Sequence, residues 1–256
     1  MSKEEINFDD LKEVQAKSPF KSLNIQDDEV LYKCTERVAC STCKRPMKHY
    51  CYYCYTVLGM DRCEIPFVKL PVTLDVIKHE KELDGKSTAL QAKILAPEDV
   101  QVYGWNSMPK YSNPDRILLL YPGEDAKRLN EIPRDSFDHL IVIDGTWKQA
   151  KKMVRDTPIL QKVRKVTIEP RSTYFWRFQN ISINYLATIE AIYYLYVEFA
   201  LAYEVENQKY DGRYDNLLFY YKYLYDLIQY SYIRGQHKDK IFCWRHRSNY
   251  IKESKD

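Results

Sequence analysis

Residues 139–147, His-Leu-Ile-Val-Ile-Asp-Gly-Thr-Trp, decide how this chain folds. The apolar run over residues 139–143 is typical of a buried strand in a parallel sheet. Asp144 and Gly145 then predict a turn. Thr146 and Gln149 have the spacing of a helix capping box, so we expect a helix over residues 146–155. A carboxylate between a strand and a helix lies where open α/β sheets bind ligands, although Asp-Gly is also a common turn.

Similar alternation of strand-like and helix-like segments extends in both directions. The predicted strands besides residues 139–143 are residues 67–76, 90–95, 117–121 and 163–168. The other predicted helical segments are an acidic turn at residues 97–103, a short helix from residue 124 to 129, and two long helices over residues 184–203 and 215–232. Residues 78–86 are charged and predict a loop or hairpin. This order predicts an α/β fold with a parallel sheet.

The composition is that of a globular protein with an uneven charge distribution. The chain has 256 residues, 45% of them hydrophobic, which is enough for one large domain or for a domain with a small satellite. Net charge is only +3, but residues 148–165 contain seven Lys or Arg and a single acid, Asp156. Such a basic stretch either suits a phosphate-bearing partner or is simply a solvated helix face. The 23 tyrosines suit packing in the core and at its boundary more than stacking on bases.

Nothing in the sequence predicts secretion or a membrane span. The N-terminus is polar and acidic, without the apolar region of a signal peptide. The longest apolar stretch, residues 184–203, contains Glu190, Glu198 and several tyrosines, so we expect a buried helix. An intracellular protein without a membrane partner follows, in the nucleus or the cytosol. In a reducing compartment its cysteines indicate a metal site or free thiols.

Four cysteines form the pattern Cys40-x2-Cys43-x7-Cys51-x2-Cys54. Two such pairs can converge on one tetrahedral Zn²⁺, and four thiolates leave no open coordination position, which favours a structural role over a catalytic one. The nearby basic residues, Lys44, Arg45 and Lys48, favour ionised thiols. We expect Cys34, Cys63 and Cys243 to be free.

Four tyrosines lie in and beside the second cysteine pair, namely Tyr50, Tyr52, Tyr53 and Tyr55. They could stack on RNA bases or pack under the metal site, and we favour packing. The chain then divides into a mobile or loosely docked segment (1–33), a Cys-rich zinc-knuckle segment (34–66), an α/β domain (67–235) and a basic tail (236–256). The tail contains Arg245-His246-Arg247 and is solvated, contacts phosphates or serves as a nuclear address.

Four ordered motifs carry a resemblance to a known family. They are Asp144-Gly145-Thr146-Trp147 with Lys148-Gln149-Ala150, the loop Tyr121-Pro122-Gly123-Glu124-Asp125-Ala126, the segment Arg171-Ser172-Thr173-Tyr174-Phe175-Trp176-Arg177 and the helix start Leu186-Ala187-Thr188-Ile189-Glu190-Ala191. Together with the paired cysteines they resemble the DTW-domain family over roughly residues 34–232. Residues 190–195 and 210–220 are most similar to one of its two eukaryotic branches.

The resemblance implies a fold and an activity. The fold is SPOUT-like α/β with a C-terminal trefoil knot, and knots are rare enough that patterning alone would not predict one. The implied donor is S-adenosylmethionine (SAM), which supplies a 3-amino-3-carboxypropyl group. The implied acceptor is N3 of a tRNA uridine at position 20 in the D-loop, and methylthioadenosine is released. The implied partners are tRNA and no membrane, and we expect a monomer.

The resemblance also assigns candidate site residues. Asp144 is the expected base, or it orients N3, and Thr146 and Trp147 complete the catalytic motif. The expected cofactor-binding residues are Leu120, Tyr121, Pro122, Gly123, Asp144, Gly145, Thr188, Glu190 and Ala191. The expected contacts to RNA or to the carboxylate of the donor are Lys148, Lys151, Lys152, Arg155, Arg171, Ser172, Tyr174 and Arg177. Two structural alternatives stay open. The segment from Arg171 to Arg177 is an ordinary surface loop, or Glu190 only binds a helix N-terminus.

One position departs from the family pattern. The Ser that begins the last motif is Ala187 here, which removes the capping side chain, and Thr188 is the candidate to replace it. Two other functions fit the same motifs. A SPOUT-type RNA methyltransferase would release S-adenosylhomocysteine, and a non-catalytic zinc-knuckle protein would bind tRNA without SAM.

Overall fold

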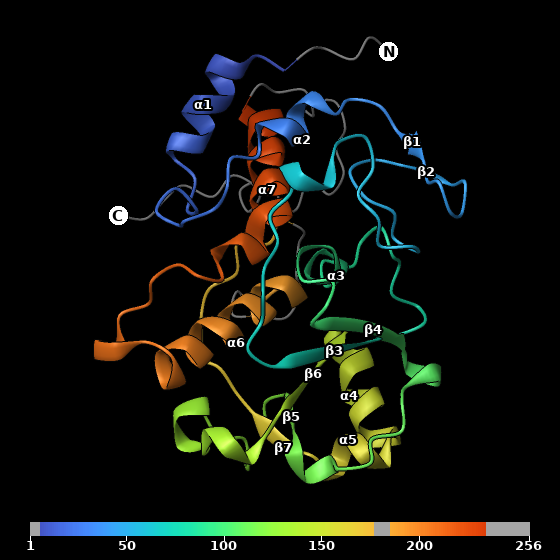
Figure 1. Cartoon of the computed structure of the whole chain (residues 1–256), viewed down its shortest axis with the longest axis vertical. Helices are drawn as coiled ribbons and strands as arrows, with labels where there is room; N and C mark the ends of the chain where they lie inside the picture. The colour runs from blue at the N-terminus through green and yellow to red at the C-terminus, as the bar shows by residue number, and fades with distance from the viewer. Residues whose placement is uncertain (1–5, 177–184, 234–256) are drawn as a thin grey trace.

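A five-stranded parallel sheet forms the centre of the molecule (Figure 1). The computed structural model describes residues 6–176 and 185–233. The strand order is β4-β3-β6-β5-β7, and every neighbouring pair is parallel. The strands are β3 (Thr73–Lys78), β4 (Val100–Gly104), β5 (Ile117–Leu120), β6 (His139–Asp144) and β7 (Arg164–Val166). The predicted α/β fold with a parallel sheet is therefore confirmed.

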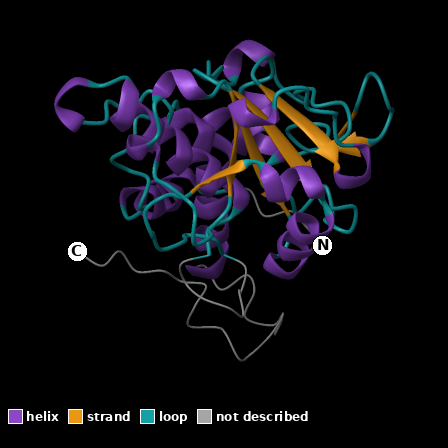
Figure 2. Cartoon of the chain, turned by 90° about the horizontal axis from the view of Figure 1, so that it is seen from below, coloured by secondary structure: helices purple, strands orange, loops and turns teal. Residues whose placement is uncertain are grey.

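Helices cover both faces of this sheet (Figure 2). They are α1 (Phe8–Ala16), α2 (Glu29–Lys33), α3 (Leu90–Leu95), α4 (Trp147–Asp156), α5 (Pro158–Lys162), α6 (Thr188–Tyr203) and α7 (Phe219–Ile233). Leu140 and Val142 of β6 join the core formed with α3, α6 and α7, whereas Ile141 faces α4 and α5. Among the residues described here, none of the helices has the length and apolar character needed to cross a bilayer.

The connections between strands create a ligand-binding edge. β3 continues through α3 to β4 on one side of the sheet, and β6 continues through α4 and α5 to β7 on the other. β3 and β6 are direct neighbours, with Lys78 opposite Asp144 at their carboxyl ends. Adjacent strands whose connections diverge form a switch point, where open α/β sheets bind ligands. Asp144 lies at this point.

Two predicted elements have the opposite type. Residues 90–95 form the helix α3, not a strand, and residues 100–104 form the edge strand β4, not part of a helical turn. α3 is almost wholly buried, and a short apolar run does not distinguish a buried helix from a buried strand. In β4, Val100 is buried, Gln101 is exposed and the last three residues are half-buried, as expected for a strand at the edge of the sheet.

Two further boundaries differ from prediction. Residues 124–128 form a turn and an extended stretch, not the predicted helix, and Leu129 begins a short 3-10 helix. Lys127 forms a bridge with Val166 that prolongs the sheet edge. β3 begins at Thr73, well after residue 67, because Pro71 has no N–H to donate to a neighbouring strand. The strand over residues 139–143 and the helix after Thr146 are confirmed.

In the described part of the N-terminal segment, α1 packs on the last helix. We expected residues 1–33 to be mobile or loosely docked, but Leu11 and Val14 of α1 are buried in the same core as α7. Lys222 of α7 binds Asp28 at 2.8 Å and Asp226 at 3.1 Å, with all three side chains largely buried. Apolar contact and a buried ion cluster together hold this segment.

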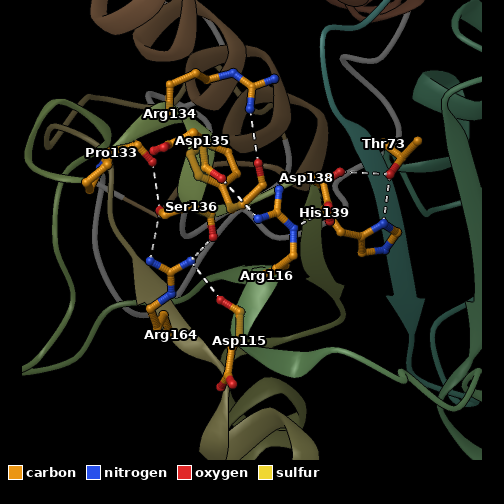
Figure 3. Close-up of polar contacts among 11 residues, drawn as sticks. Thr73, Asp115, Arg116, Pro133, Arg134, Asp135, Ser136, Asp138, His139 and Arg164 are labelled. Carbon is orange, nitrogen blue, oxygen red and sulfur yellow. Dashed lines mark hydrogen bonds and ion pairs between the residues drawn. The ribbon is translucent and has the colours of Figure 1, made fainter.

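Arginines bind the backbone at the amino edge of the sheet (Figure 3). Arg164 donates to the backbone oxygens of Asp115 and Ser136, at 2.9 and 2.6 Å. Arg116 binds the Asp138 carboxylate at 2.6 Å and the carbonyl of Asp135 at 3.0 Å. These bonds hold the starts of β5, β6 and β7 together.

Between α2 and β3 in the chain comes a small two-stranded antiparallel sheet of β1 (Val38–Ala39) and β2 (Pro46–Met47). It carries the paired cysteines. We call residues 38–58 the knuckle.

Candidate active site

Asp144 ends β6 as a buried carboxylate, 3% exposed. Ser87 donates its hydroxyl to Oδ2 at 2.6 Å, and Thr188 donates its hydroxyl to Oδ1 at 2.7 Å. The three side chains come from β6, from the loop after β3 and from the first residue of α6. Each oxygen therefore has one fixed hydroxyl partner and keeps capacity for another donor.

Burial dominates the electrostatics of this carboxylate. It raises the pKa of Asp144 above its ordinary value of 3.8, and the hydroxyls of Ser87 and Thr188 and the nearby charge of Lys78 oppose the rise. Lys78 itself is held by Asp84 at 2.9 Å and by the carbonyl of Glu82 at 2.8 Å. A carboxyl with a raised pKa is suited to accepting a proton.

The loop over residues 79–88 joins β6 to α6. Ser87 binds Asp144, and the next residue, Thr88, accepts the backbone N–H of Ile189 at 3.2 Å. Ile189 is the second residue of α6, so Thr88 supplies from a distant loop the cap that Ala187 cannot supply. The loop thus sets the position of Thr188 relative to Asp144.

The turn after Asp144 is tightly packed. A Cβ atom at Gly145 would lie 3.0 Å from Gln149 Oε1 and 3.3 Å from the Cβ of His79, so only glycine fits without displacement. Thr146 and Gln149 form the predicted reciprocal capping box: Thr146 donates its N–H at 2.7 Å and accepts that of Gln149 at 3.4 Å. Thr146 is thereby committed to the helix start.

Aromatic rings gather at the same edge of the sheet as Asp144. Trp147 is half-buried, and the centroid of its ring lies 4.6 Å from that of Tyr185 and 6.4 Å from that of Tyr121. Tyr121 follows β5, the neighbour of β6, and exposed Pro122 and Gly123 continue the loop at the same edge. Leu120, at the end of β5, is half-buried there. The predicted strand-end loop and the DGTW motif therefore share one edge of the sheet.

Glu190 is buried and fully engaged in local structure. It accepts the Thr173 hydroxyl at 2.5 Å and the N–H groups of Tyr174 and Ala187 at 2.8 and 2.7 Å. Burial raises the pKa of Glu190, and these three bonds oppose the rise. The loss of the family Ser at Ala187 therefore leaves Glu190 firmly oriented, and its observed contacts are those of a residue that binds a helix start and holds residues 173–174.

Thr188 does not act as the replacement cap that we considered for Ala187. Its hydroxyl points to Asp144 instead, so this residue belongs to the polar centre of the site. Ala191, also predicted to bind the cofactor, is half-buried one turn into α6.

The predicted arginine segment is only partly close to the site. Arg171 lies over the ring of Tyr194, 4.5 Å from its centroid, and 3.8 Å from Glu198. Glu198 is ten residues beyond Thr188, roughly 15 Å along the helix, so Arg171 is remote from Asp144. Ser172 is exposed, and Tyr174 packs edge-on against Phe20. Arg177 lies outside the described residues.

The predicted basic residues of α4 are exposed but differ in pairing. Lys152 and Arg155 both bind Asp156. No ion pair among the described residues involves Lys148 or Lys151. Because α4 begins at Trp147, the unpaired lysines lie in the first turns next to the site.

The four knuckle cysteines converge as predicted. Their sulfur atoms, from Cys40, Cys43, Cys51 and Cys54, all lie within 4.8 Å of one another. Tetrahedral Zn–S bonds of about 2.3 Å would place sulfurs about 3.8 Å apart, so the set fits a zinc ion.

The two halves of the knuckle repeat one backbone pattern. The carbonyls of Cys40 and Cys51 accept the N–H four residues later at 2.9 and 3.0 Å, and Lys44 and Tyr55 at these positions both have positive φ. Backbone N–H bonding, chiefly from Cys43, lowers the pKa of Cys40 to about 6. The residues present therefore fit a structural metal site.

Sequence reasoning missed Ser87 and Thr88, which are as close to the site as the motif residues. Both hydroxyls reach partners far away in sequence, and no periodicity or motif marks them. A Ser-Thr pair that ends a charged loop and precedes a helix was the available signal.

The fold and this site define an α/β protein with a buried carboxylate at the switch point of its sheet and a cysteine knuckle beside it. A family model described as the DTW domain matches residues 37–229. The chain belongs to the DTW domain family, and the resemblance seen in its motifs is confirmed.

Curated relatives cover most of the chain. It is 34% identical to "tRNA-uridine aminocarboxypropyltransferase 1" of Mus musculus, over 84% of this chain and 86% of the relative. The protein of the same name from Homo sapiens is 33% identical over the same shares. "tRNA-uridine aminocarboxypropyltransferase 2" of Drosophila melanogaster is 28% identical over 52% of this chain and 54% of the relative. No solved structure matches the chain significantly.

Proposed function

We propose that this protein transfers the 3-amino-3-carboxypropyl group of SAM to N3 of a tRNA uridine and releases methylthioadenosine. The names of the relatives support the reaction class. The single observation in the structure that carries the proposal is the Asp144 carboxylate, buried at the switch point and bound by two hydroxyls. We propose position 20 of the D-loop as the acceptor, in line with the family resemblance.

The chemistry requires removal of a proton and displacement at carbon. Uridine N3 attacks the methylene carbon next to sulfur in the amino acid arm, the C–S bond breaks, and its electron pair neutralises the sulfonium. In our proposal Asp144 accepts the N3 proton through the half-exposed hydroxyl of Thr188, because the carboxylate itself is 3% exposed. A raised pKa brings this carboxyl closer to the value that suits a base.

Positioning supplies the rest of the catalysis. A sulfonium is already a good leaving group, so alignment of donor and acceptor is the main requirement. We propose that Trp147, Tyr121 and the loop at Pro122 and Gly123 bind the donor, and that Lys148 and Lys151 contact tRNA phosphates. Aromatic faces and a carboxylate are both favourable neighbours for a sulfonium cation.

We further propose a SPOUT-like fold with a C-terminal trefoil knot, a Zn²⁺ ion held by Cys40, Cys43, Cys51 and Cys54, and a monomeric protein in the nucleus or cytosol. The parallel sheet and the converging sulfurs support the first two. Zinc bound there would stabilise the knuckle and take no part in the transfer, because four thiolates close its coordination sphere.

The test combines purified protein, SAM and unmodified tRNA, followed by nucleoside mass spectrometry and identification of the nucleoside by-product. The expected result is one uridine enlarged by an aminocarboxypropyl group and an equal amount of methylthioadenosine. A methylated uridine with S-adenosylhomocysteine would instead indicate a methyltransferase. Binding of tRNA without modification or SAM affinity would indicate a non-catalytic RNA-binding protein.

A further inference from the structure

One side of the knuckle is docked on the domain, and the other side faces solvent. His49 Nε2 lies 3.1 Å from the Tyr223 hydroxyl, and the ring of Tyr50 packs edge-on against Tyr220 at 4.9 Å between centroids. Tyr220 and Tyr223 both lie in α7 and belong to the main buried core. They fix the orientation of the knuckle, which Figure 1 shows at the edge of the molecule on the side away from α1.

The solvent side of the knuckle carries positive charge. Residues 37–60 contain four basic residues, Arg37, Lys44, Arg45 and Lys48, and no Asp or Glu. Lys44 and Arg45 are exposed, and no ion pair among residues 6–176 and 185–233 involves either. On α4, by contrast, Asp156 neutralises two of the four predicted basic residues.

An aromatic ring lies on the same side. Tyr53 is 48% exposed, and the guanidinium carbon of Arg45 lies 4.0 Å from its ring centroid. We favoured packing for all four knuckle tyrosines, and the structure agrees for Tyr50, Tyr52 and Tyr55, but Tyr53 is an exposed exception. An exposed ring beside unpaired cations is the combination that binds unstacked bases and their phosphates.

The knuckle also touches the loop that builds the site. A Cβ atom at Gly85 would lie 3.4 Å from Cε2 of Tyr52, so this ring packs on the loop. Two residues later Ser87 binds Asp144. The chain between the Cα atoms of Gly85 and Ser87 spans at most about 7 Å, so the knuckle and the carboxylate are near neighbours.

We infer that Lys44, Arg45 and Tyr53 form a second tRNA-binding surface, which grips nucleotides flanking the modified uridine while Asp144 acts on the uridine itself. This inference rests on the proposed function for the identity of the RNA. Phosphates pair with Lys44 and Arg45, and one unstacked base lies on Tyr53. The nearby cysteine site then has a functional consequence, because it holds this surface rigidly next to the loop at residues 79–88.

The experiment measures tRNA affinity directly, without SAM, for three variants of the whole protein. Lys44→Gln/Arg45→Gln and Tyr53→Ala alter the surface, and Lys12→Gln/Lys17→Gln removes the same charge from exposed positions on α1 and at its C-cap. Zinc content and melting temperature are measured for each variant. We expect each knuckle variant to bind about tenfold more weakly, the double charge variant to reduce the salt slope of log Kd by about two, and the α1 variant to bind like the wild type.

Equal affinity for all proteins would overturn the inference, and so would equal weakening by both double charge variants, since that would reflect net charge alone. Displacement of tRNA by polyglutamate at matched charge concentration would also overturn it in favour of an acidic protein partner. Binding is independent of turnover, so the two proposals fail separately. If the wild type modifies tRNA and the knuckle variants bind tRNA normally, only the proposed binding surface is refuted. If tRNA binding depends on the knuckle but no tRNA is modified, only the proposed transferase activity is refuted.

Discussion

The amino and carboxyl edges of the sheet both have polar groups at the strand ends, but different side chains form hydrogen bonds there. At the amino edge, exposed arginines such as Arg164 and Arg116 donate to backbone carbonyls that begin strands (Figure 3). At the carboxyl edge, the buried Asp144 accepts hydroxyls from Ser87 and Thr188. At the amino edge, arginine N–H groups and backbone carbonyls are hydrogen-bonded to each other. At the carboxyl edge, the buried Asp144 carboxylate can still accept further hydrogen bonds in a low-dielectric environment.

This difference separates stability from function. Solvated arginine bonds cost little to form and hold strand ends in register. Burial of Asp144 is unfavourable for its charged form and is offset by only two hydroxyls and the nearby Lys78. A protein keeps such a group where chemistry needs it, so we expect mutations at the two edges to have opposite consequences.

Removal of the metal should have the largest effect, and only at one edge. Apparent zinc-binding energies of about 10 kcal/mol or more exceed what a small cysteine segment can replace. A chelator should therefore increase amide exchange in residues 38–58 and, through the Tyr52–Gly85 contact, at Lys86 and Ser87, whose N–H groups bond Leu83. Exchange at Arg116 and Asp138 should stay low.

The control for metal removal is Cys63→Ser, an exposed thiol outside the cluster, which should leave zinc content unchanged. Unchanged exchange in the knuckle after complete zinc removal would contradict the metal's structural role.

Asp144→Asn should abolish most activity while sparing the fold. Loss of a base is expected to lower turnover in the modification assay by roughly 10²- to 10⁴-fold. Asn is nearly isosteric and uncharged, so the free energy of unfolding should stay equal or rise at pH 7. The matched change at the other edge, Asp138→Asn, should leave turnover within about twofold, because the Arg116 pair is exposed. Wild-type turnover by Asp144→Asn would eliminate the base assignment.

The same variant carries a pH prediction. Because burial raises the pKa of Asp144, the folded state holds the proton more tightly than the unfolded state. The stability that this group contributes is present below its unfolded value of 3.8 and is lost as pH rises through the folded value. The stability advantage of Asp144→Asn over the wild type should therefore shrink as pH falls toward 4. Urea unfolding across this range measures it, and an advantage that grows toward acid pH would contradict the raised pKa.

Ser87→Ala should have an intermediate effect. It removes one hydrogen bond to a buried charge, worth about 1.4 kcal/mol or a tenfold loss of kcat/KM. Without this donor the pKa of Asp144 rises further, so the acidic limb of the pH–rate profile should move to higher pH. Ser136→Ala is the same change at the amino edge, and it should change neither kcat/KM nor the acidic limb of the pH–rate profile. A lower rate without a shifted limb would show that Ser87 only supports the loop.

Arg164→Ala should have the smallest effect, and on stability alone. Its side chain is exposed and bonds Asp115 and Ser136, so we expect unfolding to become easier by about 1 kcal/mol with normal turnover. Arg164→Lys should recover only part of the lost stability, because one ammonium group does not reproduce the planar donor geometry of a guanidinium. Chemical denaturation and the modification assay check both statements. A fall in kcat would show that the amino edge also contributes to catalysis, and would contradict the division of stability and function between the two edges.

Local signals account for the correct predictions. The apolar run of β6, the Thr146–Gln149 capping box and the cysteine spacing each need only neighbours in the chain, and all three are present in the structure. The DTW motif was recognisable for the same reason. The errors at residues 90–95 and 97–103 arose because short elements take their type from what covers them, as α3 does, which is almost wholly buried.

The sequence alone was enough to predict the class of fold, the place of Asp144 at a strand end, the convergence of the four cysteines and the family. The folded structure was needed to show that Ser87 and Thr188 hold that carboxylate, that Thr88 caps α6 in place of Ala187, and that Arg171 lies roughly two helical turns or more from the site. Strand period and capping depend on residues a few positions apart. Contacts across 57 or 101 residues depend on how whole elements pack, and no local pattern encodes them.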